Sequence, residues 1–99
     1  MTMKKNIENN KHELQLLIKG FNHFKLKNIK TAISFFTEAI SAYGSPLGYL
    51  YAGTLSSEEG TSKRYLNIAQ LAVKNKALPK EVFDQHVEFL VRIGLLTKS

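Results

Sequence analysis

Three histidines, His12, His23 and His86, are the first candidates in this chain for binding a metal or moving a proton. No two of them have the close spacing that puts metal ligands on one helix face. His86 precedes Val87 on an amphipathic segment, and we interpret it as a half-buried structural histidine. The chain has no cysteine, which excludes thiolate catalysis, disulfides and cysteine zinc sites. We therefore predict no metal site.

Other catalytic patterns are also missing from the local sequence. The glycines at 44, 48 and 53 lack the Gly-Lys-Ser/Thr ending of a phosphate-binding loop. The acid pair Glu58–Glu59 lies in the polar run SSEEGTS, which is typical of a solvated loop. No neighbouring serine, histidine and acid suggest a nucleophile with its base, although a triad of distant residues stays open. We expect a binding protein that is not an enzyme and needs no cofactor.

Apolar residues at helical spacing predict four helices, over residues 10–26, 29–43, 62–76 and 79–93. The second is the clearest, because apolar residues hold one face from Ile29 to Tyr43 with Phe36 at the centre. Asn28 can cap its start, and Gly44 can end it with a positive φ. Pro79 and Gly94 similarly fit the two ends of the last helix.

Each of the other three helices also has an expected buried stripe. That of the third helix comprises Tyr65, Ile68, Ala69, Ala72 and Val73. The stripe of the first helix comprises Leu14, Leu17, Ile18, Phe21 and Phe24. That of the last comprises Phe83, Val87 and Leu90, and Leu95 can fold back after Gly94. A further set has the spacing of a tetratricopeptide unit: Gly20, Ala32, Phe36 and Ala39. The 34-residue period does not repeat, so we interpret this set as small and aromatic residues packed between two antiparallel helices.

Short connections within the two predicted helix pairs favour antiparallel neighbours. We predict an all-α, antiparallel up-down four-helix bundle, with residues 1–99 as one domain and a flexible N-terminus over about 1–9. The connection Gly44–Thr61 joins the pairs and can hold a short helical turn around Leu47–Leu55. The uncharged run 39–57 contains a proline and three glycines, which argues against a membrane-spanning helix, and the N-terminus lacks the apolar region of a secretory signal. We expect a cytoplasmic protein.

The formal net charge of +6 favours acidic partners, although plain solubility explains it equally well. In an up-down bundle of four helices the first and third turns lie at the same end. This predicts a basic pole, opposite Glu58 and Glu59, made of Lys25, Lys27, Lys30, Lys74, Lys76 and Lys80. Such a pole could contact an anionic surface such as the inner membrane leaflet. Alternatively, the lysines only complement helix C-termini.

Aromatic and apolar residues also gather around the long connection, where Tyr43, Tyr49 and Tyr51 accompany Leu47 and Leu50. They can close the open end of the bundle. Alternatively, they can form a partner-binding patch, a role for which tyrosine is well suited.

The stretch SKRYLNIAQLAVKNKALPKEVFDQHVEFLVRIG resembles the C-terminal half of the pediocin-like (class IIa) bacteriocin immunity proteins, the enterocin A immunity group. The resemblance covers about residues 47–94 and rests on a helix ending in a lysine-rich turn, followed by the spacing of Leu78, Phe83, Val87 and Leu90. It implies an antiparallel four-helix bundle in the cytosol of a Gram-positive bacterium.

The resemblance also implies a protective function. Family members are thought to recognise the bacteriocin-occupied receptor, the mannose phosphotransferase permease, from inside the membrane. Their specificity is associated with the C-terminal half. The candidate contacts in this chain are Lys63, Arg64, Lys74, Lys76 and Lys80. Two alternatives stay open: a small basic nucleic-acid-binding regulator, and a toxin-binding immunity protein of another class.

Overall fold

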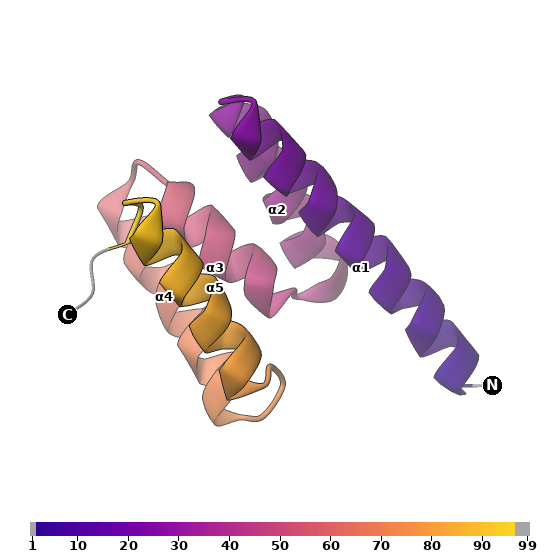
Figure 1. Ribbon diagram of the computed structural model, residues 1–99. Coiled ribbons are helices and arrows are strands. Elements are labelled where there is room, and N and C mark those ends of the chain that lie inside the picture. The colour runs from indigo at the N-terminus through magenta and orange to yellow at the C-terminus, as the bar shows by residue number, and fades with distance from the viewer. Residues whose placement is uncertain (1, 97–99) are drawn as a thin grey trace.

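The computed structural model describes the backbone of residues 2–96 and the side chains of residues 11–96. This part of the chain forms five α-helices and no strand, which confirms the all-helical class (Figure 1). The helices are α1 (Thr2–Lys25), α2 (Ile29–Tyr43), α3 (Pro46–Leu55), α4 (Glu59–Lys74) and α5 (Lys80–Arg92). Residues 2–9, for which we expected flexibility, are part of α1. Among the described residues, no helix combines the length and apolar character needed to cross a membrane.

Helix α3 is the main difference from the predicted architecture, because the expected short turn in the long connection is a ten-residue helix. The Ser45 hydroxyl accepts a hydrogen bond from the Gly48 amide at 3.1 Å, and Pro46 occupies the first turn. Both features favour helix initiation. Leu50, Tyr51 and Ala52 are almost completely buried, so this segment lies at the centre of the molecule.

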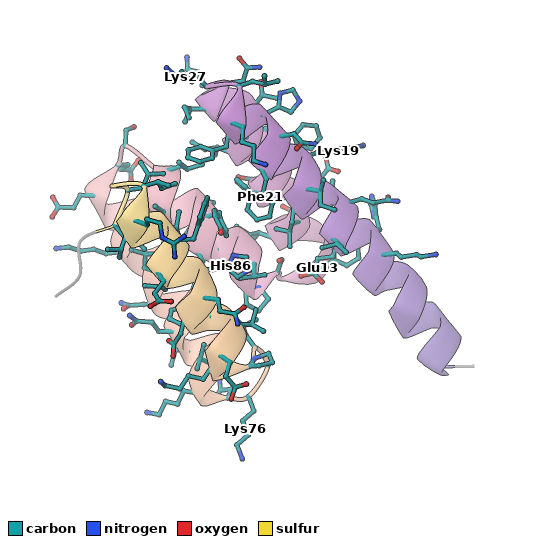
Figure 2. All side chains as sticks on the ribbon, viewed as in Figure 1. Glu13, Lys19, Phe21, Lys27, Lys76 and His86 are labelled. Atoms are coloured by element: carbon teal, nitrogen blue, oxygen red, sulfur yellow. The ribbon has the colours of Figure 1, made fainter. Side chains whose placement is uncertain are left out.

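The additional helix changes the end of the molecule at which the last turn, between α4 and α5, lies. Successive turns of an up-down chain alternate between the two ends, so one additional helix moves the last turn to the opposite end. Figure 2 shows Lys27, in the α1–α2 turn (residues 26–28), and Lys76, in the α4–α5 turn (residues 75–79), at opposite ends of the molecule. The prediction of a single basic pole is therefore wrong, and its lysines divide into two groups.

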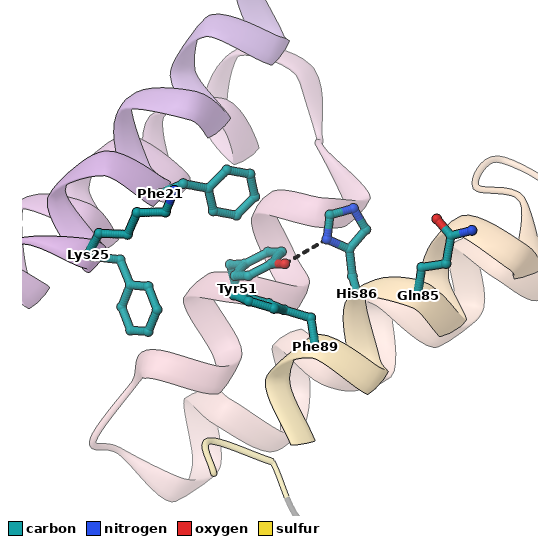
Figure 3. Close-up of a pocket in the computed structure, with 7 residues that line it drawn as sticks. Phe21, Lys25, Tyr51, Gln85, His86 and Phe89 are labelled. Carbon is teal, nitrogen blue, oxygen red and sulfur yellow. Dashed lines mark hydrogen bonds between the residues drawn. The ribbon is translucent and has the colours of Figure 1, made fainter. Parts of the chain in front are cut away.

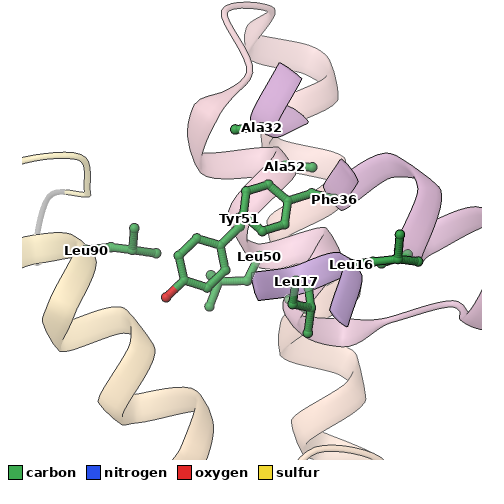
Figure 4. Close-up of a cluster of buried hydrophobic side chains, with 10 residues drawn as sticks. Leu16, Leu17, Ala32, Phe36, Leu50, Tyr51, Ala52 and Leu90 are labelled. Carbon is green, nitrogen blue, oxygen red and sulfur yellow. The ribbon is translucent and has the colours of Figure 1, made fainter. Parts of the chain in front are cut away.

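The core joins the α1–α2 pair to the other three helices (Figure 4). Phe36 of α2 is fully buried, and its ring lies 5.6 Å from that of Phe21 and 5.3 Å from that of Tyr51, centroid to centroid. Leu90 of α5 is also fully buried and belongs to the same cluster. The predicted central position of Phe36 and the predicted inward face of the last helix are confirmed.

The predicted stripe of α1 is partly wrong. Leu17 is buried, and Phe21 and Phe24 pack against the core, but Leu14 and Ile18 are 55% and 45% exposed. Leu16, which we had not placed in the stripe, is buried instead. Because α1 packs chiefly against α2, it buries a narrower strip than a helix surrounded by neighbours.

The helix ends also refine the predictions. Gly44 and Gly94 have φ values of +60° and +83°, as expected for residues that end a helix. Asn28 precedes α2 as predicted, but its side chain makes no capping hydrogen bond. Leu96 packs against the core after Gly94, whereas the predicted residue, Leu95, is 38% exposed.

Close packing of α1 on α2 depends on Gly20. A Cβ atom at this position would lie 2.6 Å from the Phe36 ring, which neighbouring aromatic rings prevent from moving away. The predicted contact between small and aromatic residues is thereby confirmed. It explains the tetratricopeptide-like spacing without a repeat.

We predict that Gly20→Ala lowers the free energy of unfolding by about 1–2 kcal/mol, because overpacking outweighs the gain in helix propensity. The matched control is Gly60→Ala in the first turn of α4, where an added Cβ meets no atom within 4 Å. This control should be neutral or should gain up to about 1 kcal/mol. Urea unfolding of both variants checks the prediction, and equal effects of the two substitutions would contradict it.

Candidate functional site

The five cationic residues proposed as partner contacts all lie exposed on the α4–α5 segment. Three are near the α4–α5 turn: Lys74 ends α4, Lys76 lies within the turn and Lys80 begins α5. Lys63 and Arg64 lie in the first half of α4. At a rise of about 1.5 Å per residue, Arg64 is roughly 15 Å along the helix from Lys74. The five cations therefore form two separate groups, one in the first half of α4 and one around the α4–α5 turn, and not a compact cluster.

Local ion pairs distinguish these cations from one another. The Lys63 amine lies 3.3 Å from a Glu59 carboxylate oxygen, and the Lys80 amine donates a hydrogen bond to Asp84 at 3.0 Å. Both pairs are exposed and partly neutralise their lysines. Within residues 11–96, Arg64, Lys74 and Lys76 have no ion-pair partner. Among the five candidate contacts, these three side chains thus keep the strongest electrostatic attraction for an acidic partner.

Arg64 and Lys74 lie on the same exposed side of α4, because a separation of ten residues leaves them about 80° apart around the helix axis. Between them lies Leu71, whose surface is 53% exposed. Leu71 lines a shallow hollow with Asn67, Gln70 and Lys74. We call Arg64, Asn67, Gln70, Leu71 and Lys74 the α4 outer face. We had predicted no role for Leu71, although its position outside the predicted buried stripe of this helix indicated an exposed side chain.

The two tyrosines proposed for a partner-binding patch occupy different environments. Tyr49 is half-buried, and its ring packs edge-to-face on Tyr65 with centroids 5.2 Å apart. Tyr51 is only 2% exposed, so it is a core residue that a partner cannot reach without opening the fold. The patch is thus reduced to Tyr49. The reason is that α3 turns the connection inward.

The hydroxyl of Tyr51 lies 2.6 Å from Nδ1 of His86 on α5 (Figure 3). Burial raises the pKa of Tyr51 to about 12, and burial lowers the pKa of His86 below its ordinary value. Both side chains are therefore neutral near pH 7. The phenol is the better donor and the imidazole nitrogen the better acceptor, so Tyr51 donates and His86 carries its proton on Nε2. The predicted half-buried structural histidine is confirmed.

A pocket of about 360 Å³ lies beside this pair, where α1, α3 and α5 meet (Figure 3). Its walls are mostly aromatic, and Lys25 is the charged residue among those that line it. The complete lining is Phe21, Phe24, Lys25, Tyr51, Gln85, His86 and Phe89. The sequence separates these residues by up to 68 positions, so local spacing could not reveal the pocket.

The lowered pKa of His86 predicts a pH dependence of stability. The unfolded chain binds a proton at His86 near pH 6.5, whereas the folded chain does so only at lower pH. Stability is therefore fully present above about pH 6.5 and falls as the pH drops toward the folded-state pKa. We expect urea midpoints between pH 7.5 and about pH 5 to fall less in His86→Gln than in the original chain. An unchanged pH dependence in this variant would mean that His86 is already solvated.

Within the described residues, no three histidine, aspartate or glutamate side chains gather as metal ligands. Comparison of the chain with protein-family models, with characterised proteins and with solved structures finds no match. The chemistry available at the α4 outer face is recognition, by exposed cations around an apolar side chain.

Proposed function

We propose that this chain is an immunity protein that protects its own cell from a class IIa, pediocin-like bacteriocin. In this proposal it is a binding protein without catalytic activity, acting in the cytoplasm. Its partner is the bacteriocin-occupied membrane receptor, the mannose phosphotransferase permease, approached from the inside. The resemblance of residues 47–94 to the enterocin A immunity group motivates the proposal. The all-helical structure is compatible with it.

The observation that carries the proposal is the exposure of the α4 outer face. Leu71 is 53% exposed, although burial of a leucine side chain is favourable by about 2 kcal/mol. Two cations without an ion-pair partner among the described side chains lie on both sides of it, at Arg64 and Lys74. An apolar side chain flanked by charges fits a partner surface with an apolar contact and acidic surroundings. This face belongs to the segment in which the family resemblance places specificity.

A membrane-bound receptor places its cytosolic surface beside the anionic inner leaflet. A lysine or arginine near such a leaflet contributes about 1 kcal/mol of attraction. Lys74 and Lys76 would therefore serve in two ways, by peripheral contact with the leaflet and by contact with an acidic receptor loop.

Expression of the full chain in a sensitive strain tests the proposal. We expect the lethal concentration of at least one class IIa bacteriocin to rise, while sensitivity to unrelated pore-forming peptides stays unchanged. Unchanged killing by a broad panel of class IIa bacteriocins would overturn the proposal. Protection only from an unrelated toxin would instead favour an immunity protein of another class.

A nucleic-acid-binding regulator makes a different prediction, namely a salt-dependent shift of DNA or RNA fragments. Its phosphate-facing surface would need a continuous row of cations. The lysines of the two turns lie at opposite ends of the molecule, which does not favour this alternative (Figure 2).

A further inference from the structure

We infer that the pocket between α1, α3 and α5 binds a small amphipathic carboxylate, a molecule with an apolar chain or ring and one negative head group. The inference rests on the pocket alone and is independent of the proposed function. The pocket is separate from the proposed partner contacts, because none of Lys63, Arg64, Lys74, Lys76 and Lys80 lines it.

The apolar part of the ligand is defined by three phenylalanines on two helices. Phe21 and Phe24 come from α1, and Phe89 comes from α5 and is 38% exposed at the pocket. Figure 3 shows the Phe21 and Phe89 rings on opposite sides of Tyr51. An apolar chain entering here would remove these rings from water, which is the main source of affinity in such pockets.

The cation and the hydrogen-bond donors that line the pocket define the polar part of the ligand. Lys25 lies next to Phe24 on α1 and is the positively charged member of the lining. Tyr51 holds Nδ1 of His86 in a hydrogen bond, which leaves the Nε2–H of that ring as a further donor. Gln85 adds an amide group. A cation with neutral donors, and no acidic side chain in the lining, complements a carboxylate.

The size of the pocket favours a small molecule over a protein segment. Its volume of about 360 Å³ lies at the lower end of the roughly 300–1,000 Å³ that small-ligand pockets span. A medium-chain fatty acid has the required single charge and apolar chain. The same chemistry could come from a free carboxylate or from an acyl lipid in a membrane, and the test separates these sources.

Octanoate below its micelle-forming concentration is the probe, and amide NMR shifts of the isotope-labelled full chain are the readout. We expect saturable shifts centred on Phe21, Lys25 and His86, and weaker binding of the neutral analogue 1-octanol. Lys25→Gln should weaken octanoate binding about fivefold, the equivalent of one exposed charge interaction, and leave octanol binding unchanged. Lys19→Gln is the matched control, because Lys19 is exposed on the same helix and lies outside the pocket lining.

Three outcomes would overturn the inference. The first is an absence of saturable octanoate shifts at the pocket. The second is equal binding of octanoate and octanol with no effect of Lys25→Gln. The third is a response of pocket residues to phosphatidylglycerol vesicles but not to octanoate, which would indicate a membrane contact.

Discussion

Phe36→Ala should lower the free energy of unfolding by about 3–5 kcal/mol, the range for removing a large buried side chain. Phe36 is fully buried, and its ring contacts those of Phe21 and Tyr51 from two other helices. Its loss would open a cavity where α1, α2 and α3 meet. A domain of this size has roughly 5–15 kcal/mol of stability in total, so the variant should be close to unfolding. Urea unfolding followed by circular dichroism measures the change.

Phe35→Ala is the matched control for this prediction, because it makes the same substitution one residue away on α2. Phe35 is only half-buried and stacks on the His23 ring near the protein surface, with centroids 5.4 Å apart. We expect it to cost about 1 kcal/mol. If Phe35→Ala destabilised the protein as much as Phe36→Ala, the inward face of α2 would be assigned incorrectly.

The largest functional effect should come from the three candidate contacts of the α4–α5 segment that have no ion-pair partner within residues 11–96. We predict that the triple variant Arg64→Gln, Lys74→Gln and Lys76→Gln reduces protection against the cognate bacteriocin on the order of 10–100-fold in lethal concentration. All three positions are exposed, so each substitution should change stability by less than about 0.5 kcal/mol. Killing curves in the sensitive strain give the loss of protection. Helicity and the thermal midpoint of the purified variant should stay close to the original values.

The matched control removes three cations from elsewhere: Lys11→Gln, Lys27→Gln and Lys30→Gln. It lowers the formal net charge of +6 by the same amount. Each triple variant also substitutes one lysine with a φ of +65°, which is Lys27 in the control and Lys76 in the test variant. Any effect of substitution at this backbone conformation is therefore common to both. We expect full protection from the control. Equal loss in both triple variants would mean that protection depends on total charge rather than on Arg64, Lys74 and Lys76.

Much of the fold could be predicted because it depends on local sequence. The stripe of α2 has Phe36 at its centre and glycine after its end, and both features have the expected positions in the structure. The same holds for the inward face of α5 and for the half-buried His86. In each case helical periodicity decides which side chains face the core.

Helix α3 could not be predicted as a full helix for a physical reason. It is buried on nearly all sides, so its sequence PLGYLYAGTL lacks the polar face that makes a helical period visible. Its glycines suggested a loop, but in the structure Gly48 and Gly53 allow close approach: an added Cβ would lie 3.0 Å from the Phe36 carbonyl oxygen and 2.9 Å from the Tyr65 Cβ, respectively. The wrong basic pole and the misassigned Tyr51 both follow from this one helix.

We propose that the chain recognises the receptor only when the bacteriocin occupies it. The most direct measurement is affinity purification of the tagged full chain from detergent-solubilised sensitive cells, with and without the cognate bacteriocin. We predict that the mannose phosphotransferase permease is recovered with the chain only after bacteriocin treatment, and that the Arg64, Lys74 and Lys76 variant recovers much less of it. Recovery that does not depend on bacteriocin, or no recovery from cells that the chain protects, would contradict the claim.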